Sequence, residues 1–152
     1  MEYIKTKPPT TGCFFCAAQD KPFSAPDLIL YRDQQLVVLM NRFPYANGHL
    51  LVAPTRHLAD ITELTPEESN GLAAMLQRCT KILRRQLRPD GFNLGLNLGE
   101  VAGAGVASHL HWHIVPRWHG DHNYMTVLAE VRTIPEHIEK TFSRLLPEFQ
   151  KQ

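Results

Sequence analysis

The chain has 152 residues, of which 43% are hydrophobic, and a formal net charge of +1. This length and composition predict one domain with a hydrophobic core. The near-neutral charge argues against electrostatic binding to nucleic acid, which requires a basic surplus. No apolar run approaches the roughly 18 residues of a membrane-spanning helix, and residues 1–9 are polar, unlike a signal peptide. We therefore expect a cytoplasmic protein that binds neither nucleic acid nor membrane.

Residues 1–26 are proline-rich and are expected to form a loop. Residues 28–31 and 36–40 are short apolar runs around a polar turn, which predicts a pair of strands. Residues 41–48 contain turn-forming residues and connect this pair to a third predicted strand at 49–54.

A long helix is predicted to begin at Thr65, with Pro66 at its first position and Glu68 completing a capping box. It is expected to end at residues 88–91, whose sequence is Arg-Pro-Asp-Gly. Apolar residues keep helical spacing on one face, and Cys79 among them is expected in the core. That face comprises Leu72, Met75, Leu76, Cys79, Ile82, Leu83 and Leu87. The basic residues of this helix are expected to face solvent, and they are Arg78, Lys81, Arg84, Arg85 and Arg88.

Residues 92–98 alternate as expected for a strand, and a glycine- and alanine-rich loop at 99–107 leads into residues 109–115. A second helix is predicted over 135–149. Strands in sequential order followed by a long helix favour an α+β fold with an antiparallel sheet.

Histidine is concentrated in one segment, since five of the eight histidines fall within residues 109–122. On a strand, His109, His111 and His113 would point the same way, about 7 Å apart, while the intervening residues Leu110 and Trp112 would enter the core. Such a row is a poor packing surface but a good chemical one. Two chemistries compete: a catalytic zinc held by all three imidazoles, or a histidine that attacks phosphorus.

From His109 to Val115, histidines alternate with apolar residues. This stretch resembles the signature of the histidine triad (HIT) family of nucleotide hydrolases and transferases. Residues 39–44 and 47–54 resemble the nucleotide-binding segment of its fragile-histidine-triad branch. Trp112 and residues 116–121 are similar to bacterial relatives of diadenosine tetraphosphate phosphorylases.

The resemblance spans about residues 13–128 and implies a HIT fold over the single domain 1–152. That fold has a five-stranded antiparallel sheet with helices on one side, a core at 27–128 and a C-terminal helix at 133–152. It also implies a homodimer whose sheets join.

For catalysis, the resemblance implies that His111 attacks the α-phosphorus of an adenosine nucleotide and forms a covalent nucleotidyl-histidine, and the expected substrates are dinucleoside polyphosphates. Water or phosphate would then accept the nucleotide. His109 and His113 would orient the nucleophile, and His49 would line the active site. A divalent cation with the substrate phosphates is compatible with this scheme.

For substrate binding, the resemblance implies that Asn41 binds the ribose and Asn97 contacts phosphate. Leu39 and Leu51 would wall the base, although both also fit a plain core position. The family's glutamine before the triad is missing here. Two residues of the glycine-rich loop and their backbone amides are expected to stand in for it: Gly105 and Ser108.

Cys13 and Cys16 form a Cys-x-x-Cys pair, which could be redox-active, free, or half of a zinc site. The odd total of three cysteines argues against a disulfide framework. The resemblance implies that His57 and His109 complete a four-ligand structural zinc site. Such a site would pin the N-terminal loop against the segment that carries His111.

Three rival functions stay open: a nucleotide-binding regulatory module with little turnover, a hydrolase of nucleoside phosphoramidates or adenylyl sulfate, and a hydrolase with zinc held by the triad. Five residues after the triad could contact nucleotide or belong to a solvated loop: Arg117, Trp118, His119, His122 and Asn123. The loop is favoured for His119 and His122.

Overall fold

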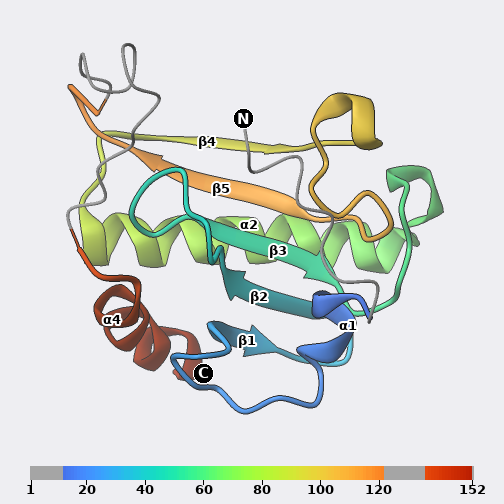
Figure 1. Ribbon diagram of the computed structural model, residues 1–152, viewed down its shortest axis with the longest axis horizontal. Helices are drawn as coiled ribbons and strands as arrows, with labels where there is room; N and C mark the ends of the chain where they lie inside the picture. Colours follow the sequence, from blue (N-terminus) through green and yellow to red (C-terminus); the bar gives the residue numbers. More distant parts are fainter. Residues whose placement is uncertain (1–11, 122–135, 152) are drawn as a thin grey trace.

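The computed structural model describes residues 12–121 and 136–151, and its described strands form one antiparallel sheet in the order β1-β2-β3-β5-β4 (Figure 1). The five expected strands are therefore confirmed, with ends shifted by a few residues. Their bounds are Ile29–Arg32 (β1), Leu36–Met40 (β2), Leu50–Pro54 (β3), Gly91–Leu96 (β4) and Trp112–Arg117 (β5).

Helices α2 (Pro66–Leu87) and α4 (Ile138–Gln150) cover one face of the sheet (Figure 1). The start of α2 is confirmed, because the Thr65 side chain accepts a hydrogen bond from the Glu68 backbone and the Glu68 side chain accepts one from the Thr65 backbone. Its end is also confirmed, since Arg88 turns into the left-handed region. Part of the expected second helix, residues 133–135 and 152, lies outside the described residues.

The apolar face of α2 packs as expected on the helix side of the sheet, and Cys79 is fully buried there. The basic residues of α2 are exposed as expected, except for Arg78. The Arg78 guanidinium lies over the rings of Tyr31 and Phe149 and donates to the Phe149 carbonyl at 2.8 Å. Arg78 is half-buried because its planar cation packs on aromatic rings while it caps the end of α4.

The N-terminal segment contains a helix that was expected to be loop, and it lies on the other face of the sheet. Helix α1 (Phe14–Ala17) is a single turn, closed by the Ala17 N–H to the Cys13 carbonyl at 3.0 Å. Phe15 is fully buried in a second apolar cluster with Leu39 and Leu51. The expectation that helices lie on one side is therefore wrong for α1, because Phe15 needs this second cluster for its burial.

The strand expected to carry all three histidines begins only at Trp112, so His109 and His111 precede it. The strand begins late because the backbone before it forms hydrogen bonds outside the sheet. The His109 N–H donates to the Val106 carbonyl at 3.3 Å, and the Leu110 N–H donates to the Leu58 carbonyl at 2.7 Å. These N–H groups are unavailable to a sheet ladder. The alternation nevertheless persists, since Leu110 is buried and Trp112 packs against the helix-side cluster.

Two short 3-10 turns, η2 (Ile61–Glu63) and η3 (Glu100–Ala102), complete the described elements. No described helix is both long and apolar enough to cross a membrane. The single-domain prediction and its internal boundaries stay predictions, and residues 122–128 of the expected core lie outside the described residues.

Candidate active site and metal centre

The three triad imidazoles lie close together on the α1 face of the sheet. The ring of Phe15 lies under the first two, with centroids 5.0 Å from His109 and 5.0 Å from His111. The His111 and His113 centroids are also 5.0 Å apart. The prediction that these side chains share one side of the chain is confirmed, although only His113 belongs to β5.

The tautomer of His111 is set by its own backbone neighbourhood. Its Nδ1 lies 2.8 Å from the carbonyl oxygen of His109, and a carbonyl only accepts, so Nδ1 carries the proton. The Nε2 atom of the neutral ring therefore presents a lone pair. Burial lowers the pKa of His111 below its ordinary value, so the ring is neutral near pH 7. A buried neutral imidazole with a bare Nε2 is a competent nucleophile.

His113 and His49 form a hydrogen-bonded pair whose proton positions follow from one backbone group. The Tyr45 N–H donates to His49 Nδ1 at 3.1 Å, so the proton of the neutral His49 ring is on Nε2. That Nε2–H points at His113 Nδ1, 2.9 Å away, which places the His113 proton on its Nε2. His113 Nε2 is buried and has no hydrogen-bond partner among the described residues.

This orphaned N–H is the one buried side-chain polar atom of the described chain that lacks a partner. Because such groups are costly to leave unpaired, this donor beside His111 is available to an acceptor that enters the site. Burial, followed by the proximity of His111, lowers the pKa of His113 to about 4. The ring is therefore neutral near pH 7 and donates through Nε2 only.

Asn41 and the two leucines expected around the nucleoside lie on the same face. Leu39 pairs with Leu51 across β2 and β3, and Leu51 pairs with His113 across β3 and β5, so the three form one row. Asn41 lies at the end of β2 and is buried. Its Oδ1 accepts from the Phe43 N–H at 3.0 Å, and its Nδ2 lies 3.4 Å from His49 Nδ1. Their roles toward ribose and base stay predictions.

The expected phosphate-binding residues lie in the loop that precedes the histidines. The Asn97 Nδ2 donates to the Gly103 carbonyl at 3.3 Å and so closes this loop around η3. Gly103 has a φ of +87°, which favours glycine there. Gly105 and Ser108 are exposed. Their contribution to phosphate binding stays a prediction.

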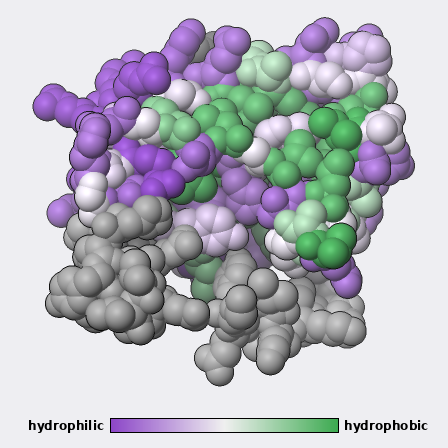
Figure 2. Space-filling view, turned by 90° about the horizontal axis from the view of Figure 1, so that it is seen from above, coloured by the Kyte–Doolittle hydropathy of each residue, from purple (hydrophilic) through white to green (hydrophobic). Residues whose placement is uncertain are grey.

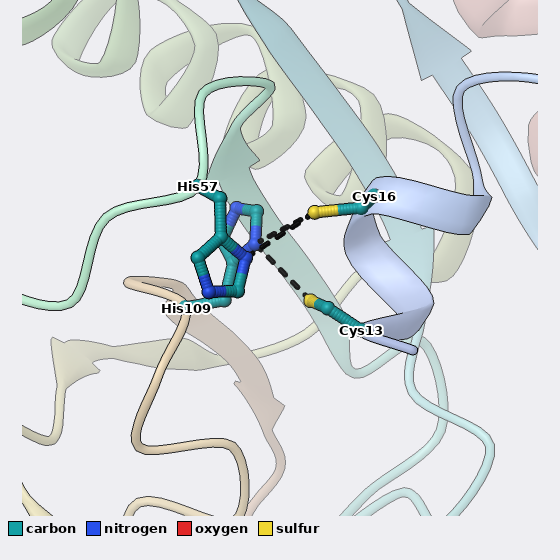
Figure 3. Close-up of side chains that lie close together, drawn as sticks. All are labelled: Cys13, Cys16, His57 and His109. Carbon is teal, nitrogen blue, oxygen red and sulfur yellow. Dashed lines mark hydrogen bonds between the residues drawn. The ribbon is translucent and has the colours of Figure 1, made fainter. Parts of the chain in front are cut away.

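The four expected zinc ligands converge, as Figure 3 shows: Cys13 and Cys16 at α1 point at the imidazoles of His57 and His109. One ligand atom from each side chain lies within 4.8 Å of all the others. Three of the sulfur–nitrogen distances are 3.2, 3.3 and 3.7 Å. Tetrahedral zinc with ordinary bond lengths separates such ligands by about 3.5 Å, so the cluster fits the ion.

The proton on His109 also suits a metal ligand. Its Nε2 donates to the Pro54 carbonyl at 2.8 Å, which leaves Nδ1 bare and facing the sulfurs. A backbone carbonyl that orients the far nitrogen is a common arrangement at metal sites. Within the described chain, this is the only group of three or more possible ligands that converges. The triad itself offers no second such group, which disfavours zinc held by all three histidines.

The residues after the triad lie apart from this row of rings. Arg117 makes a two-pronged ion pair with Asp121 and donates to Asn93 at 2.7 Å. His119 is exposed and contacts Asp90 at 2.9 Å, in agreement with a solvated loop. His122 and Asn123 lie outside the described residues.

Three contributors escaped the sequence analysis. Phe15 supports two imidazoles, and its only signal was its apolar place between the two cysteines. Tyr45 fixes His49 through its N–H, and its ring lies parallel to His113 with centroids 5.9 Å apart. The carbonyl of Pro54 orients His109. Backbone donors and acceptors leave no mark in a sequence, so the last two had no signal.

Comparisons with known proteins agree with this geometry. The HIT domain model matches residues 23–120. The AP-4-A phosphorylase of Mycobacterium tuberculosis is 39% identical over 125 residues, which are 82% of this chain and 64% of that protein. An uncharacterised HIT-like protein of Methanocaldococcus jannaschii is 31% identical over 109 residues, which are 72% of this chain and 81% of that protein.

Among solved structures, a Zn-bound histidine triad family protein from Mycobacterium smegmatis aligns with a TM-score of 0.70 and 31% identity. The alignment covers 91% of this chain and 93% of that one. The chain spans less than two thirds of the M. tuberculosis relative, at 64% of its length. The matched domain and the identity to these relatives show that the chain belongs to the HIT family.

Proposed function

We propose that the protein cleaves adenosine nucleotides at the α-phosphate through a covalent nucleotidyl-histidine at His111. The observation that carries this proposal is the His111 tautomer: Nδ1–H is held by the His109 carbonyl at 2.8 Å, so Nε2 carries the lone pair. Attack forms an N–P bond and breaks the bond from phosphorus to the leaving-group oxygen. The acceptor then breaks the N–P bond and releases the nucleotide.

His113 supplies the donor beside this nucleophile. Its buried Nε2–H, without a partner among the described residues, would bind a phosphate oxygen or the leaving oxygen as negative charge develops there. His49 holds the donor in place through its own Nε2–H, 2.9 Å from His113 Nδ1. Asn97, Gly105 and Ser108 would contact the phosphates, and Asn41, Leu39 and Leu51 the nucleoside.

The substrate class and acceptor are drawn from the relatives. The M. tuberculosis relative is named as an AP-4-A phosphorylase, which favours a dinucleoside polyphosphate as substrate and inorganic phosphate as acceptor. Water as the acceptor would make the protein a hydrolase, with the same intermediate at His111. A divalent cation could screen the substrate phosphates without joining the bond-making step.

The metal centre is proposed to be structural. Cys13, Cys16, His57 and His109 would fill all four positions of a tetrahedral zinc ion and leave none for substrate. The ion supplies a rigid cross-link between α1 and the segment leading to His111. The Zn-bound relative from M. smegmatis supports the choice of metal.

A homodimer is proposed through the edge of the sheet at β4. This strand pairs with β5 on one side only among the described elements, so its other edge offers unpaired backbone groups. Seen from that side, hydrophobic side chains gather at the surface (Figure 2), and Leu94, Leu98 and Val101 are 47%, 38% and 103% exposed. An apolar edge strand favours pairing with a second copy.

The test is a substrate panel of dinucleoside polyphosphates, adenylyl sulfate and nucleoside phosphoramidates, each with and without phosphate. We expect dinucleoside polyphosphates to be turned over best, and a reaction quenched with denaturant at alkaline pH, where an N–P bond survives, to contain protein that is heavier by one nucleotidyl group. His111→Ala should abolish this adduct and lower kcat by at least about 1,000-fold. His119→Ala, which alters an exposed histidine, should change neither.

Three results would contradict parts of the proposal. Turnover that survives His111→Ala excludes the nucleophile assignment. Nucleotide binding without turnover in the wild type supports a regulatory module instead. Preference for adenylyl sulfate or a phosphoramidate would contradict the proposed substrate class, although His111 would still be the nucleophile.

A further inference from the structure

The loop between β2 and β3, residues 41–49, carries Asn41 and His49 at its two ends. The ends are joined directly, because the Asn41 N–H donates to the His49 carbonyl at 2.9 Å. Within the loop, the Tyr45 N–H sets the His49 tautomer. The position of this loop therefore decides where the His49–His113 pair holds the buried Nε2–H of His113.

The middle of the loop is tied to helix α4, which takes no part in the chemistry proposed above. Thr141 on α4 is fully buried, and its hydroxyl lies 2.7 Å from Asn47 Oδ1 and 2.7 Å from Glu136 Oε2. The Asn47 Nδ2 is 3.5 Å from the same Glu136 oxygen. Asn47, Thr141 and Glu136 thus form a three-membered polar cluster between the loop and the first turns of α4.

This cluster is held from the outside by charge. Glu136 accepts from Arg144 at 2.7 Å, and Lys140 lies 3.6 Å away. Its carboxylate is thereby kept in place beside the Thr141 hydroxyl, whose single proton is shared between Asn47 Oδ1 and Glu136 Oε2. A buried hydroxyl between two acceptors is costly to leave unpaired, so the geometry at Thr141 is strongly determined.

We propose that Thr141 is a positioning residue for the cleavage at the α-phosphate, an inference that rests on the proposed function. Through Asn47, which is two residues from His49, it fixes the loop and so the direction of the His113 Nε2–H. Loss of the hydroxyl would let the loop shift while the sheet and both helices keep their packing. Small displacements of a catalytic donor cost roughly tenfold to a hundredfold in rate.

The test compares Thr141→Val, which keeps the shape and removes the hydroxyl, with Thr141→Ser, which keeps the hydroxyl. We expect Thr141→Val to lower kcat about tenfold with KM little changed, and Thr141→Ser to restore most of it. In ¹⁵N spectra of the imidazoles, wild-type His113 should show a protonated Nε2 and a bare Nδ1. Thr141→Val should shift these signals toward a mixture of tautomers.

Ser143→Ala is the matched control, since it removes an exposed hydroxyl from the same helix. It should leave kcat and the imidazole signals unchanged. Asn47→Ala cuts the same link from the loop side and replaces Thr141→Val if that variant does not fold.

A purely structural Thr141 would behave differently. If Thr141→Val and Asn47→Ala lower the free energy of unfolding but leave the ¹⁵N signals and kcat as in the wild type, the proposal is overturned. If the wild type turns over none of the substrates, the proposed function fails, and the ¹⁵N signals alone still decide the positioning role.

Discussion

Each triad imidazole has a different hydrogen-bond partner, and His111 differs from the other two in the nitrogen that carries its proton. His109 donates through Nε2 to Pro54 and presents Nδ1 to the cysteines. His111 donates through Nδ1 to the His109 carbonyl and keeps its lone pair on Nε2. His113 accepts at Nδ1 and keeps its proton on Nε2. The chemistry of each residue is therefore decided by a single hydrogen bond.

The half-buried, neutral His113 makes stability depend on pH. Its pKa falls from 6.5 to about 4 in the fold, mainly through burial. Between these two values the unfolded chain binds more protons than the folded one, so the free energy of unfolding decreases as the pH is lowered from 6.5 to 4. Urea unfolding at pH 7, 5.5 and 4 should show this loss.

His113→Asn isolates the contribution of this residue, because the other histidines remain in both proteins. The variant should lose less stability than the wild type between pH 6.5 and 4. Equal losses in the two proteins would mean that His113 is not held neutral in the fold.

Gly48, next to His49, has a φ of +75° and packs directly on α2. A Cβ at this position would lie 2.3 Å from Leu87 Cδ1 and 3.2 Å from Leu83 Cδ2. Gly48→Ala should therefore lower the free energy of unfolding by about 1 to 3 kcal/mol, from backbone strain and overpacking. Gly91→Ala, where no atom lies within 4 Å of the added Cβ, is the control for chemical denaturation. Equal stability of the two variants would contradict the contact with α2.

At the level of elements, Glu68 joins the start of α2 to the loop that carries His57. It accepts from the Thr65 backbone at 2.9 Å and from Arg56 at 2.9 and 2.8 Å, and these bonds lower its pKa to about 2. Glu68→Gln keeps a capping side chain but loses the ion pair, whereas Glu68→Ala loses both.

We expect Glu68→Ala to reduce stability by about 1 kcal/mol, and Glu68→Gln by less, in urea unfolding at pH 7. The contribution of Glu68 to stability is present above pH 4.5 and is lost as the pH falls toward 2. In that range the carboxylate is protonated in the unfolded chain but still ionised in the folded chain, so acid favours unfolding. Glu67→Gln, an exposed neighbour in the same turn, serves as the control. A larger loss for Glu68→Gln than for Glu68→Ala would be inconsistent with the capping role.

Elements with local signals were predictable, and those that depend on distant partners were not. Helix α2 could be placed from Thr65, Pro66 and Glu68, because its capping bonds join neighbours in the sequence. The start of β5 could not, since the Leu110 N–H pairs with Leu58, which no local pattern indicates. Helix α1 escaped for the same reason: Phe15 is buried by strands that follow it.

The candidate site was likewise predictable from the sequence only in part. The triad and the cysteine pair were visible as spaced motifs, and the resemblance supplied His57 as a distant ligand, which the structure brings to the cluster. The link from Thr141 to Asn47 spans 94 residues and involves common polar side chains. Nothing in their spacing predicts that contact.

For the whole molecule, the cluster of Cys13, Cys16, His57 and His109 links the N-terminal segment to the triad. Cys13 and His109 are 96 residues apart in the chain, and their ligand atoms lie 3.2 Å apart. We expect one zinc per chain by metal analysis. Removal by a chelator should lower Tm by about 5 to 10 °C, because ion binding stabilises only the folded state.

Cys16→Ser should lose the zinc. Cys79→Ala changes a cysteine of α2 that lies in the hydrophobic core, so this variant should be less stable but should retain the zinc. Full zinc content in Cys16→Ser would exclude this ligand set. In the zinc-free protein, release of His109 frees the carbonyl that orients His111, so activity should decrease before the sheet unfolds.

The edge strand β4 also acts at this scale, because it decides whether the sheet ends or continues into a second copy. Leu94 is 47% exposed on that strand, and its backbone edge is unpaired among the described strands. If the sheets join there, the mass in solution should be twice the chain mass of 17.3 kDa.

Leu94→Lys places a charge on the edge and should shift the protein to the single-chain mass by sedimentation equilibrium. Ile61→Lys changes an equally apolar side chain that is 40% exposed on η2, so it should remain a dimer. A wild type with the single-chain mass, or a Leu94→Lys variant that stays dimeric, would rule out β4 as the interface.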